Sequence, residues 1–314
     1  MLYWRWINLE SKFKGLKNTI SSSLHNIYSK EIKLTEKFII DSFKEREIDG
    51  HKGDYGRVLV IAGSEGFTGA AYLTTEAAVR SGAGLVTLCT HKNIQHIMSI
   101  KLTEAMTINF EQTDKINNIV AKSNVIAFGP GMGNEQLTFD ILKEIILKSD
   151  CPLVIDADGL NVLQQNLEVL EYKNNSIILT PHLAEMARLT NLTIEEIKNN
   201  KLRIAKEFAK IHNVILLLKG FNTIITDGKN TYINTTGSSA MASGGMGDTL
   251  TGIIASLIAQ GYEPLKATYL AAYIHGFCGD ELSEDMFSVT ATDLIEFLPY
   301  GIKSIVKKKL KNEN

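Results

Sequence analysis

Seven short runs of β-branched and other apolar residues recur along the chain, and most of them are continuously apolar rather than alternating. They span residues 57–63, 84–90, 124–131, 152–159, 176–182, 214–220 and 222–228. Continuous apolar runs of this length are typical of strands that are covered on both faces. The chain is therefore expected to build a central, mainly parallel sheet.

Segments with helical spacing lie between these runs. Residues 68–82 follow the first run, and residues 194–212 place Ile197, Ile204, Phe208 and Ile211 three, four and seven positions apart. Strands that alternate with helices predict right-handed βαβ units. The pattern therefore predicts an α/β fold.

Two segments depart from this alternation. Only two residues separate the last two runs, so we interpret them as a hairpin at an antiparallel edge of the sheet. Residues 1–50 are richer in charge and serine and contain one helical stretch, residues 34–46, while the first ~25 residues are expected to be loose. We therefore expect an N-terminal extension with a helix over residues 1–50, followed by a single catalytic domain over residues 51–314.

Charge and composition exclude several classes of function. The 33 Lys and Arg residues nearly balance 35 Asp and Glu residues, so no broad electrostatic surface for nucleic acid or anionic membrane is expected. No run approaches the ~18 apolar residues of a membrane span, and the N-terminus does not resemble a signal peptide. Cys89, Cys151 and Cys278 stand far apart without CxxC spacing, which favours buried thiols over a zinc site or disulfides. These features predict a cytoplasmic protein.

A glycine-rich stretch, GGMGDTLTG at residues 244–252, directly precedes an apolar run with helical spacing. Gly245 and Gly247 therefore fall at a helix N-terminus, where free backbone N–H groups converge and an oxyanion can approach closely. Asp248 is expected in the first turn of that helix, beside any bound phosphate. A plain helix-capping aspartate is the alternative, because Asp caps helices well.

More polar groups are expected near this stretch. Two further glycine-rich turns follow predicted strands, at residues 63–66 and 128–133, the first with Thr68 as the expected helix N-cap. In open α/β folds, ligands bind where the parallel strands end. Other polar residues follow strands at this edge, namely Asp156, Asp158, Thr180, His182, Glu185 and Lys219. Each alone is explained by a cap or a helix start, but together they indicate a site of acids, bases and anion donors.

The ordered motifs KGDYG, AGSEGFTGAA, GPGMG, DADGLN, LTPHLAE, LLKG and GGMGDTLTG, between Lys52 and Asp280, resemble the NAD(P)H-hydrate dehydratases. This family is a branch of the ribokinase-like superfamily, so the resemblance implies a three-layer αβα sandwich. It also implies an enzyme that repairs hydrated NADH or NADPH, S epimer. Such an enzyme phosphorylates the ring hydroxyl with ADP or ATP and Mg²⁺, and loss of phosphate then restores the dihydropyridine.

The resemblance also assigns roles to individual residues. Asp248 is expected to be the base that accepts the hydroxyl proton and to contact the hydrated cofactor, and Gly245 and Gly247 are expected to form the anion hole. The segment implied to bind the adenine nucleotide, together with Gly247, comprises Lys219, Gly220, Phe221, Asn222 and Thr223. The implied contacts of the hydrated cofactor are Phe67, Gly129 and His182. Glu185 is expected to help hold Mg²⁺ through water.

Some features leave alternatives open. Ser238 and Ser239 replace the Asn-Pro that many relatives have, which predicts a less rigid loop. A small-molecule kinase acting on a hydroxymethylpyrimidine or thiazole alcohol, or a non-catalytic nucleotide sensor, would have the same fold. The choice between ADP and ATP, and between NADH hydrate and NADPH hydrate, also stays open. The resemblance implies a homo-oligomer, with tetramers common, and the first 50 residues are too few for the epimerase to which relatives are often fused.

Overall fold

The computed structural model describes residues 31–312, so the prediction of a loose N-terminus over the first 25 residues lies outside the described residues. Ten strands form one sheet: β1 (Glu31–Lys33), β2 (Arg57–Ile61), β3 (Leu85–Thr90), β4 (Met106–Asn109), β5 (Val125–Phe128), β6 (Leu153–Ile155), β7 (Ile177–Leu179), β8 (Ile215–Leu218), β9 (Thr223–Thr226) and β10 (Thr231–Asn234). Their spatial order is β1-β10-β9-β8-β7-β6-β5-β2-β3-β4. Neighbours run parallel except on the two sides of β9, which confirms a mainly parallel sheet.

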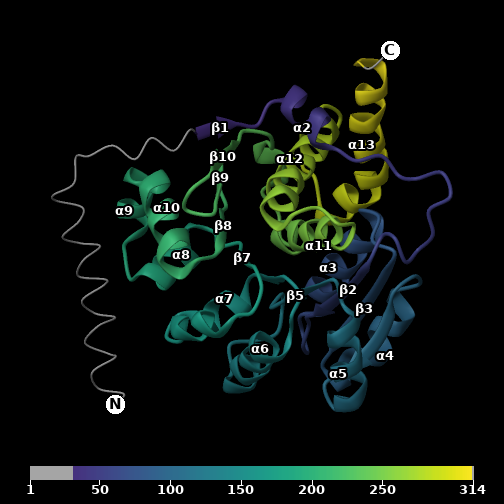
Figure 1. Cartoon of the computed structure of the whole chain (residues 1–314), viewed down its shortest axis with the longest axis vertical. Coiled ribbons are helices and arrows are strands. Elements are labelled where there is room, and N and C mark those ends of the chain that lie inside the picture. The colour runs from purple at the N-terminus through teal and green to yellow at the C-terminus, as the bar shows by residue number, and fades with distance from the viewer. Residues whose placement is uncertain (1–30, 313–314) are drawn as a thin grey trace.

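Helices cover both faces of this sheet. They are α2 (Glu36–Ser42), α3 (Thr68–Arg80), α4 (Lys92–Lys101), α5 (Thr113–Lys122), α6 (Gln136–Lys148), α7 (Asp158–Leu163), α8 (Leu183–Thr190), α9 (Ile194–Asn199), α10 (Lys201–His212), α11 (Met246–Ala259), α12 (Pro264–Ser283) and α13 (Ala291–Asn312), with 3₁₀ turns η1 (Leu167–Tyr172) and η2 (Ser239–Met241). In Figure 1, α2, α11, α12 and α13 lie on one side of the strands and α6 to α10 on the other. The predicted three-layer sandwich is thus confirmed.

The core is divided by the sheet into two apolar layers. Successive residues of β2 point to opposite layers, because side chains alternate along a strand: Val58 and Val60 join one layer, Leu59 and Ile61 the other. Cys89 and Cys278 are buried, Cys151 is half-buried, and all three are unpaired. Within residues 31–312, no helix is both long enough and apolar enough to cross a membrane.

Three local predictions were wrong. β8 and β9 pair antiparallel as expected, but β10 and β1 continue the sheet beyond them, so the hairpin is not its edge. Thr68 does not cap α3; Phe67 takes the N-cap position, and no side chain caps the helix there. Residues 194–212 form two helices, α9 and α10, rather than one, and Ile211 is exposed instead of lying on the buried face.

The segment before residue 50 takes part in the same core. β1 pairs in parallel with β10, and α2 forms within the stretch predicted to be helical, capped by the Thr35 side chain. Ile39 and Phe43 are buried in the layer that α11 and α12 also fill. This segment therefore extends both the sheet and one of its apolar layers.

Candidate active site

Several loops meet at the carboxyl ends of the central strands. The turn after β2 contacts the turn after β5, because the Gly63 N–H donates to the Pro130 carbonyl (2.9 Å) and the Ser64 hydroxyl to the Gly131 carbonyl (2.8 Å). The turn after β5 in turn contacts the start of α7, where the Gly133 N–H donates to the Asp158 carboxylate (2.9 Å). The glycine-rich turns predicted to share one edge of the sheet are therefore joined there.

Gly129 and Phe67 belong to these joined turns. Gly129 has φ +121°, and a Cβ at this position would lie 2.1 Å from the Asp156 carbonyl oxygen, so only glycine lets the β5 and β6 turns pack this closely. Phe67 backs onto the same turn, since a Cβ at Gly131 would lie 2.8 Å from the Phe67 Cβ. The Phe67 side chain is 57 % exposed, which leaves its ring accessible to a ligand.

The N-terminus of α11 supplies backbone donors at the same edge. Gly245 is the N-cap with φ +88°, and a Cβ there would lie 2.3 Å from Leu73 Cδ1. The first N–H that bonds back in this helix is that of Thr249, to the Gly245 carbonyl (3.0 Å). The N–H groups of Gly247 and Asp248 come before that of Thr249 and have no hydrogen-bond acceptor within the helix. They can therefore bind an anion.

A buried ion pair lies against this helix terminus. Lys219 Nζ is 2.7 Å from Asp156 Oδ1, and the Thr251 hydroxyl donates to Asp156 Oδ2 (2.9 Å). Burial disfavours the charged form of both side chains, but the opposite charges and the hydrogen bonds around each together have the larger effect. The pKa of Asp156 is therefore lowered, and the pKa of Lys219 is raised. A Cβ at Gly247 would lie 3.2 Å from Lys219 Nζ, so this cation is in direct contact with the helix terminus.

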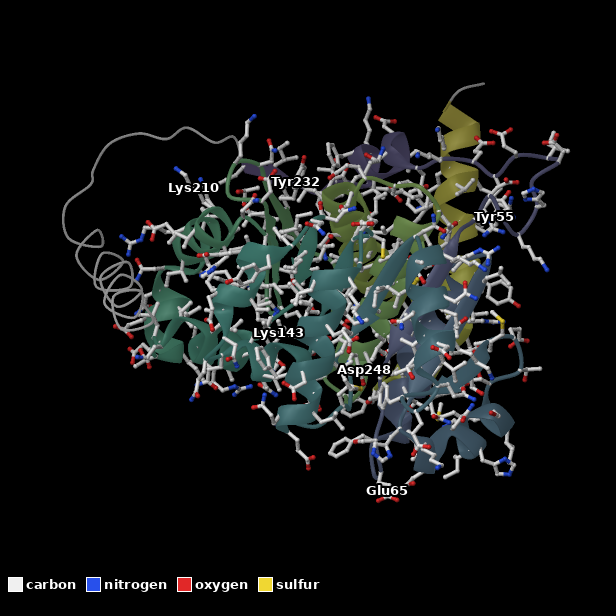
Figure 2. The ribbon with its side chains drawn as sticks, turned by 60° about the horizontal axis from the view of Figure 1, so that its bottom comes forward. Tyr55, Glu65, Lys143, Lys210, Tyr232 and Asp248 are labelled. Carbon is white, nitrogen blue, oxygen red and sulfur yellow. The ribbon has the colours of Figure 1, made fainter. Side chains whose placement is uncertain are left out.

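Asp248 lies in the first turn of α11, as predicted. Burial, followed by the nearby carboxylate of Asp156, raises its pKa to about 7, although Lys219 acts in the opposite direction. Within residues 31–312 its carboxylate has no hydrogen bond or ion pair, so it is not a capping aspartate. Figure 2 shows Asp248 well inside the outline of the molecule, above Glu65, which projects from the β2–α3 turn. A poised carboxylate of this kind suits a general base at neutral pH.

His182 and Glu185 form a capping box at the start of α8. His182 Nδ1 accepts from the N–H groups of Ala184 (3.0 Å) and Glu185 (3.2 Å), and Glu185 Oε2 accepts from the His182 N–H (2.8 Å). Burial, with the cations of Lys219 and Arg188, lowers the pKa of His182, so the ring is neutral at pH 7. Half of its side chain is exposed, and it lies beside the charged cluster, since Glu185 Oε2 is 3.9 Å from Lys219 Nζ.

The predicted nucleotide segment divides into two parts. Lys219 is turned inward to Asp156, whereas residues 220–223 form the exposed loop between β8 and β9. Phe221 is 92 % exposed and Asn222 has a left-handed φ of 54°. The Thr223 hydroxyl donates to the Gly220 carbonyl (2.9 Å). Lys219 therefore faces the charged cluster beside α11, whereas Phe221 and Asn222 lie on the exposed loop.

Three residues that contribute to the candidate site were not assigned an individual role from the sequence. Thr251 binds Asp156 from the second turn of α11, and Asp156 itself is the partner of Lys219. Lys201, at the start of α10, donates to the carbonyls of the loop at residues 220–223. A signal existed for Thr251, because it lies three positions after Asp248 on the same helix. No spacing rule links Lys201 to a loop twenty residues later.

The loop at residues 235–245, which was predicted to be less rigid, is held by hydrogen bonds to other segments. The Gly237 N–H donates to Asp280 Oδ2 (2.9 Å), and the Ser243 hydroxyl donates to the Val289 carbonyl (3.0 Å). Ser239 begins η2, while the Ser238 hydroxyl is buried and has no partner among the described residues. These contacts replace part of the rigidity that a proline would supply.

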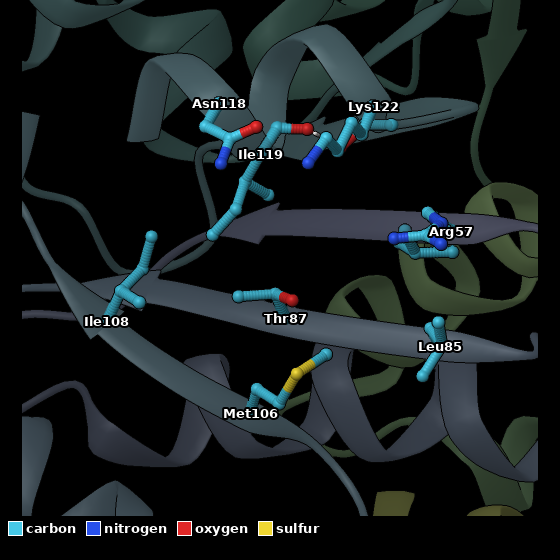
Figure 3. Close-up of a pocket in the computed structure, with 10 residues that line it drawn as sticks. Arg57, Leu85, Thr87, Met106, Ile108, Asn118, Ile119 and Lys122 are labelled. Atoms are coloured by element: carbon cyan, nitrogen blue, oxygen red, sulfur yellow. Dashed lines mark hydrogen bonds between the residues drawn. The ribbon is translucent and has the colours of Figure 1, made fainter. Parts of the chain in front are cut away.

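A separate cavity of about 240 Å³ lies elsewhere, between α5 and the sheet (Figure 3). Arg57, Leu85 and Met106, which line it, begin β2, β3 and β4. It is therefore at the amino ends of these strands, whereas the residues described above lie at the carboxyl ends. The cavity is not part of the candidate active site.

Comparison with solved structures defines the class of protein. A ribokinase-like superfamily protein from Enterococcus faecalis superposes with a TM-score of 0.80 at 30 % identity, covering 90 % of this chain and 99 % of that one. An ADP/ATP-dependent NAD(P)H-hydrate dehydratase from Bacillus subtilis, co-crystallised with ATP and Mg²⁺, gives a TM-score of 0.79 at 30 % identity, covering 89 % and 100 %. The fold is that of a ribokinase-like α/β protein.

The family can be stated more closely. The family described as NAD(P)H-hydrate dehydratase matches residues 58–300, and the chain belongs to this family. It is 32 % identical over 273 residues to an ADP-dependent (S)-NAD(P)H-hydrate dehydratase of Listeria monocytogenes, covering 86 % of this chain and 96 % of the relative. It is 41 % identical over 286 residues to a bifunctional NAD(P)H-hydrate repair enzyme of Moorella thermoacetica, covering 87 % of this chain but only 54 % of that protein. The chain thus spans about half the length of the bifunctional relative.

Proposed function

We propose that this protein dehydrates the S epimer of hydrated NADH or NADPH at the expense of an adenine nucleotide. The observation that carries the proposal is Asp248, a carboxylate with a pKa raised to about 7, at a helix N-terminus with free N–H groups. Family membership supplies the substrate class, and the dehydratase of Listeria monocytogenes is described as ADP-dependent. A base beside an anion site is what phosphorylation of a hydroxyl requires.

In the proposed reaction the ring hydroxyl first becomes a phosphate ester. Asp248 accepts the hydroxyl proton, the ring oxygen forms a bond to the terminal phosphorus, and the bond from that phosphorus to the nucleotide breaks. The N–H groups of Gly247 and Asp248 and the ammonium of Lys219 stabilise the charge of the transferred group. The ring then loses phosphate and a proton from the adjacent carbon, which restores the double bond of the dihydropyridine.

Mg²⁺ would neutralise phosphate charge in this reaction. It uses one or two carboxylates together with phosphate oxygens and water rather than an all-protein cage. The described residues fit this preference: they contain no cluster of three or more potential metal ligands, yet Glu185 and Asp248 offer carboxylates beside Lys219. We propose that Glu185 holds the ion through water.

The remaining residues are proposed to bind the two substrates. Phe67, Gly129 and His182 lie at the carboxyl edge of the sheet, where the hydrated nicotinamide ring must reach Asp248. In a neutral His182 whose Nδ1 accepts from the backbone, the proton is on Nε2, which can donate a hydrogen bond without a net charge beside the ring. Gly220 to Thr223 are proposed to bind the nucleoside portion of ADP or ATP.

A single-turnover assay tests the proposal. Purified protein, Mg²⁺ and hydrated NADPH or hydrated NADH are mixed with ADP or with ATP, and the return of dihydropyridine absorbance is followed. Recovery with one nucleotide identifies the phosphoryl donor. A stable phosphorylated product of another alcohol, detected by mass spectrometry, would instead identify a small-molecule kinase. Thermal stabilisation by nucleotide without any turnover would identify a nucleotide sensor.

The role of Asp248 is tested in the same assay. Asp248→Asn keeps the shape but cannot accept a proton, so turnover is expected to fall by about 10²–10⁴. Asp285→Asn is the matched control, because Asp285 is exposed and lies outside the site. Full turnover of Asp248→Asn would exclude Asp248 as the base.

We also propose a cytoplasmic homo-oligomer, and a tetramer is the assembly that the family resemblance implies. Unpaired cysteines suit a reducing compartment, and symmetric assemblies are the common form of such enzymes. Light scattering of the purified chain measures the assembly, and a monomer at working concentration would contradict it.

A further inference from the structure

We propose that Lys201 is a positioning residue that holds the loop at residues 220–223 in the conformation that binds the adenine nucleotide. The inference rests on the proposed function, since it assigns the nucleotide to that loop. Lys201 is the first residue of α10 and precedes the loop by about twenty positions. Its role follows from three observations.

The Lys201 ammonium donates hydrogen bonds to backbone carbonyls of this loop. Nζ donates to the carbonyl oxygens of Phe221 and Asn222, each at 2.9 Å. Among the residues that the structure describes, no carboxylate forms an ion pair with Lys201. Burial lowers its pKa to about 8, so the charge is retained at neutral pH although no anion compensates it. An ammonium with these partners stabilises the conformation of the loop and does not form a surface ion pair.

The two hydrogen bonds decide which way the loop's N–H groups face. No peptide bond between residues 31 and 312 is cis. In a planar trans peptide the carbonyl and the following N–H point in opposite directions. Because the carbonyls of Phe221 and Asn222 point to Lys201, the N–H groups of Asn222 and Thr223 point away from it. The Asn222 N–H is therefore presented on the side opposite the lysine, whereas Thr223 begins β9 and pairs with Asn234 of β10.

This arrangement is not one that the loop would keep unaided. Asn222 has a φ of 54°, a left-handed conformation that is less favourable than the right-handed one, although Asn adopts it more readily than other residues with a side chain. Two neighbouring carbonyl dipoles directed to one point also repel each other unless a cation lies between them. Without the ammonium, rotation of either peptide unit would relieve both effects and turn an N–H away from the ligand side. Lys201 thus acts on nucleotide affinity through the loop and does not contact the transferred phosphoryl group.

The test uses three variants. Lys201→Met removes the ammonium and keeps an unbranched chain, and Lys201→Arg keeps charged donors. Lys198→Met, on the exposed face of α9, is the matched control. Loss of two charge-assisted hydrogen bonds is expected to raise the nucleotide Kd and KM of Lys201→Met about tenfold or more. The KM for the hydrated cofactor and kcat should stay within about twofold, and Lys201→Arg should recover most of the loss.

Direct binding keeps this proposal separate from the dehydratase assignment. Isothermal titration with ADP and with ATP needs no hydrated cofactor, so the Kd values report on the loop even if the dehydration assay fails. A nucleotide Kd equal to that of Lys198→Met would overturn the role of Lys201. So would a loss of kcat with both KM values unchanged and a lowered melting temperature, because that pattern denotes a general loss of folded protein. Absence of nucleotide binding by the unaltered protein would overturn it as well.

Discussion

At the scale of single residues, the site contains two neighbouring carboxylates, Asp156 and Asp248, that need different protonation states. Asp156 must stay ionised to pair with Lys219, while Asp248, in the first turn of α11, is kept near half-protonated at pH 7 by burial and by Asp156. The two carboxylates are thereby assigned different tasks. Asp156 fixes the cation, and Asp248 is left to exchange a proton.

The pH dependence of turnover should report the pKa of Asp248. Only the ionised carboxylate can accept a proton, so kcat/KM for the hydrated cofactor is expected to rise with pH up to about 7 and then to level. Initial rates in a series of buffers measure the profile. Asp248→Asn should show a low rate without this inflection. The same inflection in the variant would assign it to another group, such as a phosphate of the nucleotide.

Asp248 should also lower the stability of the native state above neutral pH. Its pKa is raised on folding from 3.8 to about 7, so the folded protein holds this proton more tightly than the unfolded chain does. The resulting stabilisation is complete below about pH 4 and is lost as the pH rises through 7. Asn carries no charge, so Asp248→Asn should gain in melting temperature relative to the unaltered protein at pH 8, but not at pH 4. An equal difference at both pH values would contradict the raised pKa.

At the scale of elements, two glycines of the site are expected to respond differently to alanine. Gly247 is helical, and a Cβ there would meet side-chain atoms and no backbone, namely Lys219 Nζ at 3.2 Å and Asp156 Oδ2 at 3.4 Å. Gly247→Ala should therefore fold with a stability change below about 1 kcal/mol, yet lose about tenfold to a hundredfold in kcat through displacement of Lys219. Gly129→Ala combines φ +121° with a backbone oxygen at 2.1 Å and should lose about 3 kcal/mol or more. Denaturant unfolding and turnover of both variants separate the two effects, and an active Gly247→Ala would contradict the contact.

The helices, strands and turns that could be predicted from the sequence were those indicated by a pattern of residues close together in the chain. The seven apolar runs became β2, β3 and β5 to β9, because a strand buried on both faces needs no polar positions. β1, β4 and β10 were missed: they have three or four residues each, and part of each is accessible to solvent, which breaks the apolar pattern. The glycine turns could be located by their position after strands. The pairing of Lys219 with Asp156 could not, because 63 residues separate them and only the sheet order brings them together.

At the scale of the whole molecule, the order of the sheet determines where the site lies. β6, β7 and β8 are neighbours, so Asp156, His182 and Lys219, which follow these strands, fall in a row along one edge. α11 then covers β5 and β6 with its N-terminus directed to that row. A phosphoryl site is thus assembled from segments spread over about a hundred residues of sequence, and it depends on the integrity of the central strands.

The N-terminal segment, residues 31–43, is expected to unfold together with this sheet and not separately from it. Ile39 of α2 is completely buried in the layer that contains α11 and α12, so Ile39→Ala should destabilise the protein by about 2–5 kcal/mol. Ile48 lies five residues beyond Phe43 and is fully exposed, so Ile48→Ala should leave stability within about 0.5 kcal/mol. Urea unfolding followed by circular dichroism and by tryptic cleavage before residue 50 should give coincident transitions for both variants. An early transition seen only by cleavage would instead define residues 31–43 as a separately unfolding segment, because its loss would leave the sheet and its ligand edge intact.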